Sequence, residues 1–255
     1  MGWKHTWASF NGALMFYTCL PIPRSWPIAF AQAARWVPWV GGLIGALLAL
    51  TDLGLQAAHM PEPVKSGLVV AFGIAITGGL HLDGAMDTAD GLAVLDPDRR
   101  LAVMADSRMG AFGGIAVVVI LLLKIVALGA VIAENRPFVL VSVAMWGRWG
   151  QQWAIARYPY LKKEGKGALH KAALPSIKYV LPSLFGLLLL SGIAGAADLV
   201  PKLFIWRTVI GGIVLSLLTS AYFSRQLGGH TGDTYGAVVE WTETLLFCIL
   251  AAGTG

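Results

Sequence analysis

The chain has 255 residues, of which 56% are hydrophobic and only 13% are charged, with a mean hydropathy of +0.69. Because a soluble domain carries about 25% charged residues, this composition excludes a soluble globular protein and predicts an integral membrane protein. The net charge of +5 fits the basic loops of such a protein and does not indicate a nucleic-acid partner. Cys19 and Cys248 lie far apart in apolar surroundings, which indicates neither a disulfide nor a metal site.

The apolar runs are continuous, and each is near the ~20 residues that a helix needs to cross a bilayer. They predict an all-α polytopic membrane bundle of about seven transmembrane helices, forming a single domain over residues 1–255. Residues 5–20 are short for a span and end at a Pro-Ile-Pro-Arg stretch, so we expect an interfacial or re-entrant helix there. The expected spans are residues 37–56, 63–82, 110–133, 137–156, 178–197, 203–223 and 235–252.

Basic residues are distributed unevenly over the expected loops. The N-terminal side and loops 83–109, 157–177 and 224–234 hold twelve lysines and arginines, whereas the opposite side holds four. By the positive-inside rule, the N-terminus and these three loops face the cytoplasm. We therefore predict an active site at the cytoplasmic face of a bacterial or archaeal (inner) membrane, because the acidic motifs lie on the same side.

Residues 78–91 place three carboxylates and a histidine next to an apolar segment. Asp83, Asp87 and Asp90 are spaced i, i+4 and i+7, so a helix would bring them within about 60° of one another. Like charges this close are destabilising without a cation, and a hard divalent ion such as Mg²⁺ prefers oxygen ligands. A solvated helix end is the plainer alternative, but no basic residue lies between Lys65 and Arg99 to balance these acids.

The next polar stretch is typical of a phosphate site. Asp106 and Arg108 directly precede the small-residue segment 110–114, where a helix N-terminus would favour an anion. Arg108 could hold a phosphate while Asp106 completes the metal site. The earlier pair Arg99-Arg100 is equally consistent with a simple topology anchor.

Basic residues in and after the fourth expected span form a third group. Arg148 lies within that span, where an arginine is costly and usually faces an interior partner, so we expect it to pair with a carboxylate or with substrate. The alternative is snorkelling toward the interface. The loop that follows carries Arg157, Lys162 and Lys163 with nearby glycines, which is typical of a lid over an anionic substrate or of ordinary topology determination.

A second set of acids enters the last expected span. Asp233, Glu240 and Glu243 are spaced i, i+7 and i+10, and a helix would bring them within about 80° of one another. Acids within a span mark a functional site by default. We therefore expect Asp233 and Glu240 to complete the metal site, and Glu243 to contact substrate.

Several motifs spread over the chain match one pattern. Gly-Gly-Leu-His-Leu-Asp-Gly-x-x-Asp-Thr-Ala-Asp-Gly-Leu at 78–92 is long and specific, and Asp-Ser-Arg-x-Gly-x-x-Gly follows at 106–113. Shorter matches lie at 20–23, 40–45, 156–160 and 231–240. The chain thus resembles cobalamin synthase, a family of membrane-bound adenosylcobinamide-GDP ribazoletransferases. It departs from the pattern at Ala93-Val94, Ala105 and His230, where Gly-Gly, a lysine and an aliphatic residue are common.

The resemblance implies the last assembly step of the coenzyme B12 nucleotide loop. A ribose hydroxyl of α-ribazole, or of its 5′-phosphate, attacks the corrinoid-side phosphorus of adenosylcobinamide-GDP, and GMP leaves. A carboxylate-bound Mg²⁺ pair ~3.5–4 Å apart would neutralise the diphosphate, and basic side chains would absorb charge on the leaving GMP. His81 and Asp106 are the two candidates for the general base, with Arg108 beside them as a further catalytic residue.

Two alternative functions stay open at this stage. A CDP-alcohol phosphotransferase would also use the Asp-x-x-Asp-Gly start at 87–91, although the rest of that signature is absent. A cation-coupled transporter would use buried acids, but these usually lie near the membrane midplane rather than near span ends. The expected partners are the corrinoid and α-ribazole substrates and the lipid bilayer, with a homo-oligomer or a complex with other cobalamin-pathway enzymes left open.

Overall fold

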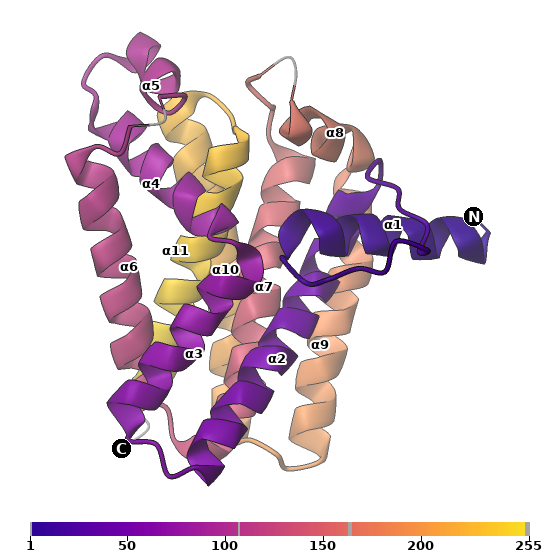
Figure 1. Cartoon of the computed structure of the whole chain (residues 1–255), viewed down its shortest axis with the longest axis vertical. Coiled ribbons are helices and arrows are strands. Elements are labelled where there is room, and N and C mark those ends of the chain that lie inside the picture. The colour runs from indigo at the N-terminus through magenta and orange to yellow at the C-terminus, as the bar shows by residue number, and fades with distance from the viewer. Residues whose placement is uncertain (1, 107, 163–164, 253–255) are drawn as a thin grey trace.

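The structure is a computed structural model that describes residues 2–106, 108–162 and 165–252. This part of the chain is helical, with connecting loops and no β-strand (Figure 1), which confirms the predicted all-α class. The long helices are α1 (Trp3–Tyr17), α2 (Val37–Ala57), α3 (Glu62–Thr77), α4 (Leu80–Ala93), α6 (Ala111–Ala130), α7 (Arg136–Arg157), α9 (Leu181–Ala196), α10 (Lys202–Leu227) and α11 (Gly232–Ala251). The shorter helices are α5 (Pro97–Val103), α8 (Lys166–Ala173), and the 3-10 turns η1 (Ala33–Trp36), η2 (Ala133–Asn135) and η3 (Ile177–Val180).

Four helical segments of the described chain are long and apolar enough to cross a membrane by themselves: Ala33–Ala57, Ala111–Ala130, Ile177–Ala196 and Lys202–Leu227. A fifth is added if α3 and α4 are counted as one broken span. Helices α7 and α11 occupy two further expected spans, but they carry polar side chains such as those of Arg148 and Glu240. The polytopic bundle is confirmed, whereas the number seven stays a prediction. Helix α1 crosses the direction of the bundle (Figure 1), as expected for an interfacial helix.

One predicted boundary is wrong. The expected span 63–82 ends early, because Gly78 (φ +60°) and Gly79 (φ +70°) adopt the left-handed conformation that ends α3 and starts α4. The two helices meet at 91°. Helix α4 thus turns away from the direction of α3, so Asp83 and the acids that follow it lie beyond this break and do not continue the line of α3.

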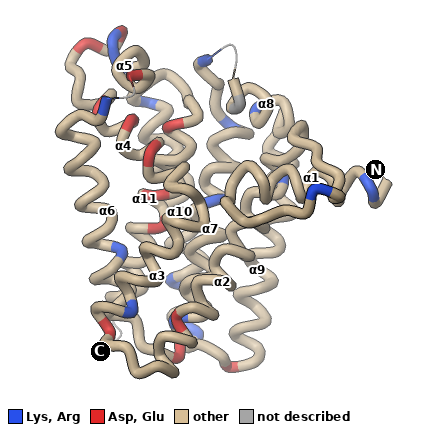
Figure 2. The backbone as a smooth tube through the Cα atoms, viewed as in Figure 1, with Lys and Arg blue, Asp and Glu red and all other residues tan. Residues whose placement is uncertain are grey.

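The predicted basic loops meet at one end of the bundle. A backbone bridge joins Tyr160 to His230, and the guanidinium of Arg100 donates to the carbonyl of Gln226 over 2.8 Å. Figure 2 shows charged residues gathered at this end, around α4, α5 and the start of α11, and a second group at the opposite end. The three loops therefore share one end of the helical bundle, whereas the side of the membrane on which that end lies stays a prediction.

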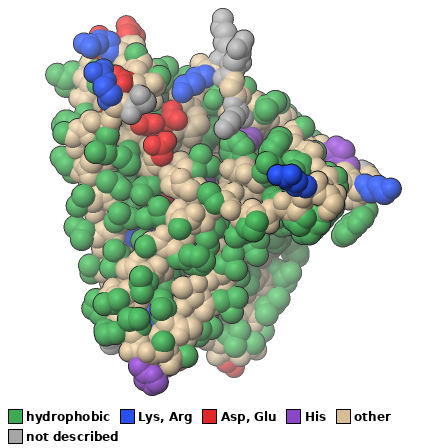
Figure 3. Space-filling view, viewed as in Figure 1, with side chains coloured by type: hydrophobic (Ala, Val, Ile, Leu, Met, Phe, Trp, Pro, Cys, Tyr) green, Lys and Arg blue, Asp and Glu red, His purple; other side chains and the backbone are tan. Residues whose placement is uncertain are grey.

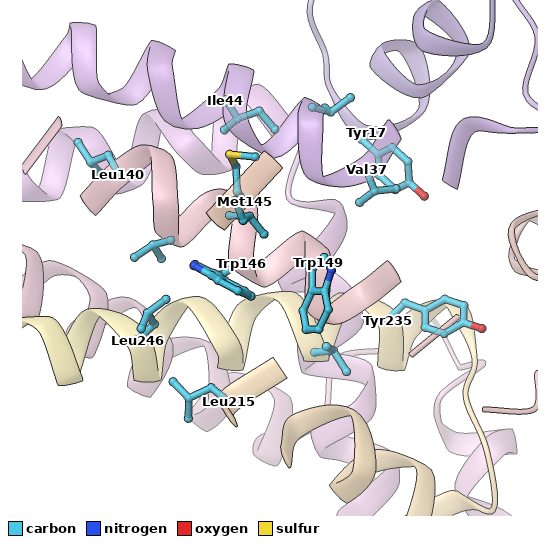
Figure 4. Packing of buried hydrophobic residues seen from close by; sticks show 14 of the residues in the cluster. Tyr17, Val37, Ile44, Leu140, Met145, Trp146, Trp149, Leu215, Tyr235 and Leu246 are labelled. Atoms are coloured by element: carbon cyan, nitrogen blue, oxygen red, sulfur yellow. The ribbon is translucent and has the colours of Figure 1, made fainter. Parts of the chain in front are cut away.

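Helix α7 forms the centre of the bundle and is buried along most of its length. Its Trp146 and Trp149 pack edge to face between α2 and α11 (Figure 4). Helix α2 approaches α7 closely, since a Cβ on Gly45 would lie 2.5 Å from the Cα of Val141. Such contacts through small residues are the usual means of helix packing in membranes, and they fix the side chains that α7 presents to its neighbours.

The far end of the bundle is held by a buried ion pair that the sequence analysis did not identify. The guanidinium of Arg136 is fully buried and contacts Asp52 at 2.5 Å and also Glu62. Glu62 is paired in turn with Lys65 at 2.9 Å. These contacts connect α2, α3 and α7 at the end opposite to the loops, so they support the fold rather than the site.

Candidate active site

The acids of two distant segments meet where α4 crosses α11. Asp83 and Asp87 of α4 and Asp233 of α11 form a group that we call the acidic cluster. The negative charges of Asp83 and Asp233 act on the half-buried Asp87 carboxyl, and Asp83 and Asp233 line one cavity. Figure 3 shows acidic side chains gathered on this face, between basic groups on either side. The structure thus brings together two halves of the predicted metal site from opposite ends of the chain.

Two glycines allow this crossing. A Cβ on Gly84 would lie 2.6 Å from the carbonyl oxygen of Asp233, and a Cβ on Gly236 would lie 2.8 Å from the carbonyl oxygen of His81. Both neighbours are backbone atoms, which cannot rotate away. The two helices therefore touch through their backbones at this point, and the carboxylates beside it are fixed relative to one another.

The charge of the acidic cluster is reflected in Asp87. Partial burial, followed by the negative charges of Asp83, Asp233 and Asp90, raises the pKa of the Asp87 carboxyl to about 6, against the opposing effect of Lys162. A carboxylate in this position is stabilised by a proton or a bound cation. The observation fits the prediction of a cation site and makes Asp87 sensitive to near-neutral pH.

Asp90 has backbone partners that the sequence did not indicate. One of its carboxylate oxygens accepts a hydrogen bond from the backbone N–H of Gly110 and the other accepts one from that of Gly113, each at 2.8 Å. These are free N–H groups at the start of α6, where a negative charge also interacts favourably with the helix dipole. Asp90 thus joins α4 to α6, and its predicted role as a metal ligand stays untested.

Asp106 and Arg108 form a local ion pair in the surface loop before α6. The Arg108 guanidinium contacts the Asp106 carboxylate at 2.6 Å, and the Arg108 side chain is 87% exposed. Hydrogen bonds from Arg108 hold the pKa of the Asp106 carboxyl at about 2. Among the described residues, no contact joins this pair to the acidic cluster.

The basic residues after α7 lie at different distances from the site. The Lys162 ammonium is 3.3 Å from an Asp233 carboxylate oxygen and lines the same cavity. Arg157 is exposed at the end of α7 with its guanidinium over the ring of Tyr158. Lys163 lies outside the described residues. Of the three predicted substrate contacts in this loop, the structure brings Lys162 to the acidic cluster.

Deeper in the bundle, four charged side chains form a group that we call the buried charge cluster: Lys124, Arg148, Glu240 and Glu243. The Lys124 ammonium contacts both glutamates at 2.7 Å, and the Arg148 guanidinium contacts Glu243 at 2.8 Å. The expectation that Arg148 pairs with a carboxylate is confirmed. Glu240, a predicted metal ligand, has an ammonium as its partner, and Lys124 is a member of the cluster that sequence reasoning missed.

His81, the first candidate base, lies in the first turn of α4 and is buried at 2% exposure. Its ring stacks on that of Tyr17 with centroids 6.1 Å apart. The Nε2 atom forms no hydrogen bond of normal geometry within the described chain, and the Gln151 side chain is its nearest polar neighbour. His81 lines the cavity of Asp83 and Asp233, so it is available to a ligand there.

Metal binding itself is not preformed in this geometry. No three His, Cys, Asp or Glu side chains in the described ranges converge closely enough to hold an ion by themselves. Mg²⁺ is usually bound through one or two carboxylates together with water and substrate phosphates, so a site of this kind stays a prediction. The fold and the acidic cluster define the class: an integral membrane protein with a carboxylate-rich site at the loop end of its helical bundle.

Comparisons with known proteins identify the family. The model of the cobalamin-5-phosphate synthase family matches residues 9–251, so the chain belongs to that family. An adenosylcobinamide-GDP ribazoletransferase of Trichormus variabilis is 54% identical over 241 residues, covering 93% of this chain and 94% of that protein. One of Thermosynechococcus vestitus is 51% identical over 251 residues, covering 98% and 99%. No solved structure matches the chain.

The family match confirms the resemblance drawn from the motifs. It covers both acidic segments and the loops between them, since residues 9–251 include every predicted site residue. It also favours that resemblance over a CDP-alcohol phosphotransferase and over a cation-coupled transporter.

Proposed function

We propose that this chain is an adenosylcobinamide-GDP ribazoletransferase, which joins adenosylcobinamide-GDP to α-ribazole or its 5′-phosphate and releases GMP. The observation that carries the proposal is the acidic cluster, in which Asp83 and Asp87 of the family motif meet Asp233 from the far end of the chain. A diphosphate substrate needs such a site for its compensating cations. The relatives at 51–54% identity carry this activity in their names.

The reaction transfers the adenosylcobinamide-phosphoryl group from GMP to a ribose hydroxyl. A bond forms between a ribose hydroxyl oxygen of α-ribazole and the corrinoid-side phosphorus, and the bond from that phosphorus to the bridging oxygen breaks. The hydroxyl proton passes to a base, and GMP leaves with the bridging oxygen as a phosphate monoester. The protein therefore has to position two substrates and provide one proton acceptor.

His81 is the better supported of the two candidate bases. It lines the cavity of Asp83 and Asp233, whereas the Asp106 carboxylate is held by Arg108 in an exposed loop that no contact within the described chain joins to the acidic cluster. Both groups are weakened as bases, because burial lowers the pKa of His81 and Arg108 lowers the pKa of Asp106, so the preference for His81 rests on its position. Arg108 is exposed in the loop before α6, close in sequence to Gly110, whose N–H group bonds Asp90, and we propose that it approaches a substrate phosphate as an outer cation.

The donor set of the acidic cluster suits Mg²⁺. Asp83, Asp87 and Asp233 offer oxygen ligands, and partial burial together with the neighbouring carboxylates raises the pKa of Asp87, with Lys162 as the opposing positive charge. Bound Mg²⁺ would neutralise the diphosphate and stabilise charge on the leaving group. Asp90 and Glu240 already have N–H and ammonium partners, so we propose structural roles for these two acids.

The remaining residues of the site supply positive charge and support. Lys162 can interact with a phosphate from its place beside Asp233, and Arg157 and Lys163 lie in the same segment of sequence. Arg148 and Glu243 form an ion pair that joins α7 to α11, so we propose that they act on substrate indirectly, through the position of α11. We place this end of the bundle at the cytoplasmic face of the (inner) membrane, because it carries the excess of basic residues.

Purified protein in detergent or liposomes should convert adenosylcobinamide-GDP and α-ribazole to the cobalamin product. Activity should disappear with a chelator and return with Mg²⁺. Asp83→Asn should abolish turnover with an unchanged melting temperature, whereas the matched change Asp98→Asn on exposed α5 should leave turnover intact. A folded, membrane-inserted protein that makes no corrinoid product would contradict the proposed function, and an active Asp83→Asn variant would contradict the metal site.

A further inference from the structure

A second feature of the site is a cavity of about 280 Å³ beside the acidic cluster. It lies between α1, α4, α11 and the segment that follows α7, and we call it the aromatic cavity. Its volume is near the lower end of the ~300–1,000 Å³ of small-molecule sites. The residues that define it are Tyr17, His81, Gln151, Tyr160 and Tyr235, with Asp83 and Asp233 at its edge.

Three buried polar atoms on its wall form no hydrogen bond of normal geometry within the described chain: Nε2 of His81, Oε1 of Gln151 and the hydroxyl of Tyr235. The His81 and Gln151 side chains lie close enough to interact with each other, so the Tyr235 hydroxyl is the group that most clearly lacks a partner. The three residues are exposed by only 2%, 4% and 2%. A buried polar group without a partner costs about 1–3 kcal/mol, and such groups are rare in folded proteins. A ligand with matching donors and acceptors would satisfy them together.

Aromatic rings also contribute to the wall. The rings of Tyr160 and Tyr235 stack with centroids 6.0 Å apart and 21° between planes, and those of Tyr17 and His81 stack at 6.1 Å and 13°. Aromatic walls with a few convergent polar atoms are typical of sites for planar, partly polar ligands. A nucleoside has this character, with its aromatic base and its hydroxyl-rich ribose.

We propose that the aromatic cavity binds the nucleoside acceptor of the reaction. The base lies among the rings of Tyr17, Tyr160 and Tyr235, and the polar atoms of His81, Gln151 and Tyr235 bond the ribose and the base edge. This inference rests on the proposed function, since it identifies where one of its two substrates binds. It makes Gln151 and Tyr235 substrate-binding residues, and neither was a candidate from the sequence.

The position of Asp83 supports this assignment. A wider and more open cavity of about 670 Å³ lies on the other side of Asp83, next to Met15 and Met86. The two cavities share Phe16, Leu80 and Asp83. The smaller, polar–aromatic cavity fits the nucleoside, and the larger one has room for a bulkier phosphorylated donor. The reacting phosphorus would then lie beside Asp83, where the two substrates meet.

The test is direct binding of α-ribazole to the full-length protein in detergent, measured by calorimetry without the corrinoid substrate. Tyr235→Phe removes one buried, unpartnered hydroxyl, so it should not lower the melting temperature. It should weaken α-ribazole binding about tenfold, equivalent to ~1.4 kcal/mol. The control Tyr222→Phe makes the same change on exposed α10, and its affinity should equal that of the wild type.

Steady-state kinetics separate this inference from the proposed function. Tyr235→Phe should raise KM for α-ribazole and leave KM for adenosylcobinamide-GDP unchanged, and Gln151→Leu should do the same. Wild-type α-ribazole affinity in both folded variants would overturn the assignment, even if turnover is normal. Conversely, tight and Tyr235-dependent α-ribazole binding by a protein that forms no product would retain the cavity and contradict the transferase reaction.

Discussion

The contact between α4 and α11 can be tested by adding a single methyl group. Gly84→Ala places a Cβ 2.6 Å from the carbonyl oxygen of Asp233 and 3.0 Å from its Cα. Both are backbone atoms of the helix that carries the third acid of the cluster. The variant leaves every proposed ligand chemically intact and alters only the distance between the two helices.

The expected size of the effect follows from these distances. Carbon and oxygen atoms normally pack at about 3.5–4.0 Å, so the helices must separate by roughly 1 Å to accept the methyl group. Overpacking of this kind costs about 1–3 kcal/mol, which exceeds the ~0.5–1 kcal/mol that alanine gains over glycine within a helix. A shift of about 1 Å in reacting groups lowers turnover by ~10²-fold, because Asp83 and Asp87 move away from Asp233.

The assay is turnover at saturating substrates together with thermal unfolding in one detergent. Gly67→Ala on α3 is the matched control, since no atom lies within 4 Å of the added Cβ. It should keep wild-type turnover and have an equal or higher melting temperature. If Gly84→Ala retains both wild-type turnover and wild-type stability, then the close α4–α11 contact does not assemble the site and the reasoning fails.

Three further predictions concern individual charges. Asp90→Asn should lower the free energy of unfolding by about 1–2 kcal/mol, because the contacts with the start of α6 are lost. The Mg²⁺ concentration that the remaining activity requires should not rise. A higher Mg²⁺ requirement at unchanged stability would instead make Asp90 a metal ligand. Lys124→Met should cost about 3–5 kcal/mol in unfolding experiments, and combining it with Glu240→Gln should cost less than the sum of the single changes. In metal-free folded protein, the Asp87 carboxyl has a pKa of about 6, whereas in the unfolded chain its pKa is near the ordinary value of 3.8. The folded state therefore binds more protons than the unfolded state between these two pH values. The melting temperature should therefore fall as pH rises from 5 to 7, and Mg²⁺ or Asp87→Asn should remove this slope; an unchanged slope in Asp87→Asn would contradict it.

Sequence patterns predicted the fold class and the acidic segments because both depend on local periodicity. Continuous apolar runs are sufficient to recognise membrane helices, and the i, i+4 spacing of Asp83 and Asp87 does place them together on α4. The basic loops were also grouped correctly at one end of the bundle. The break at Gly78-Gly79 was missed, because two glycines between apolar residues are compatible with a continuous span until their positive φ values are known.

The partners of individual charges could not be predicted, since they depend on how distant helices cross. The helical spacing places Asp90 with Asp83 and Asp87. In the structure, however, its carboxylate oxygens accept hydrogen bonds from backbone N–H groups at the start of α6. Glu240 shares a helical face with Asp233, but one face of a long helix reaches different depths of the bundle, and Glu240 meets Lys124. Gln151 offered one signal, as an amide inside an apolar span, whereas nothing in the sequence marks the Tyr235 hydroxyl as unpartnered.

The two groups of charges differ in balance, and this difference explains why only one of them suits a cation. In the buried charge cluster, Lys124 and Arg148 face two glutamates, so its formal charges balance. In the acidic cluster, three carboxylates face a single described ammonium, that of Lys162. An excess of two negative charges at a half-exposed site equals the charge of one divalent ion. The bundle thus neutralises its interior with its own side chains and leaves uncompensated negative charge where the two cavities meet, which is where a metal-bound diphosphate would have to lie.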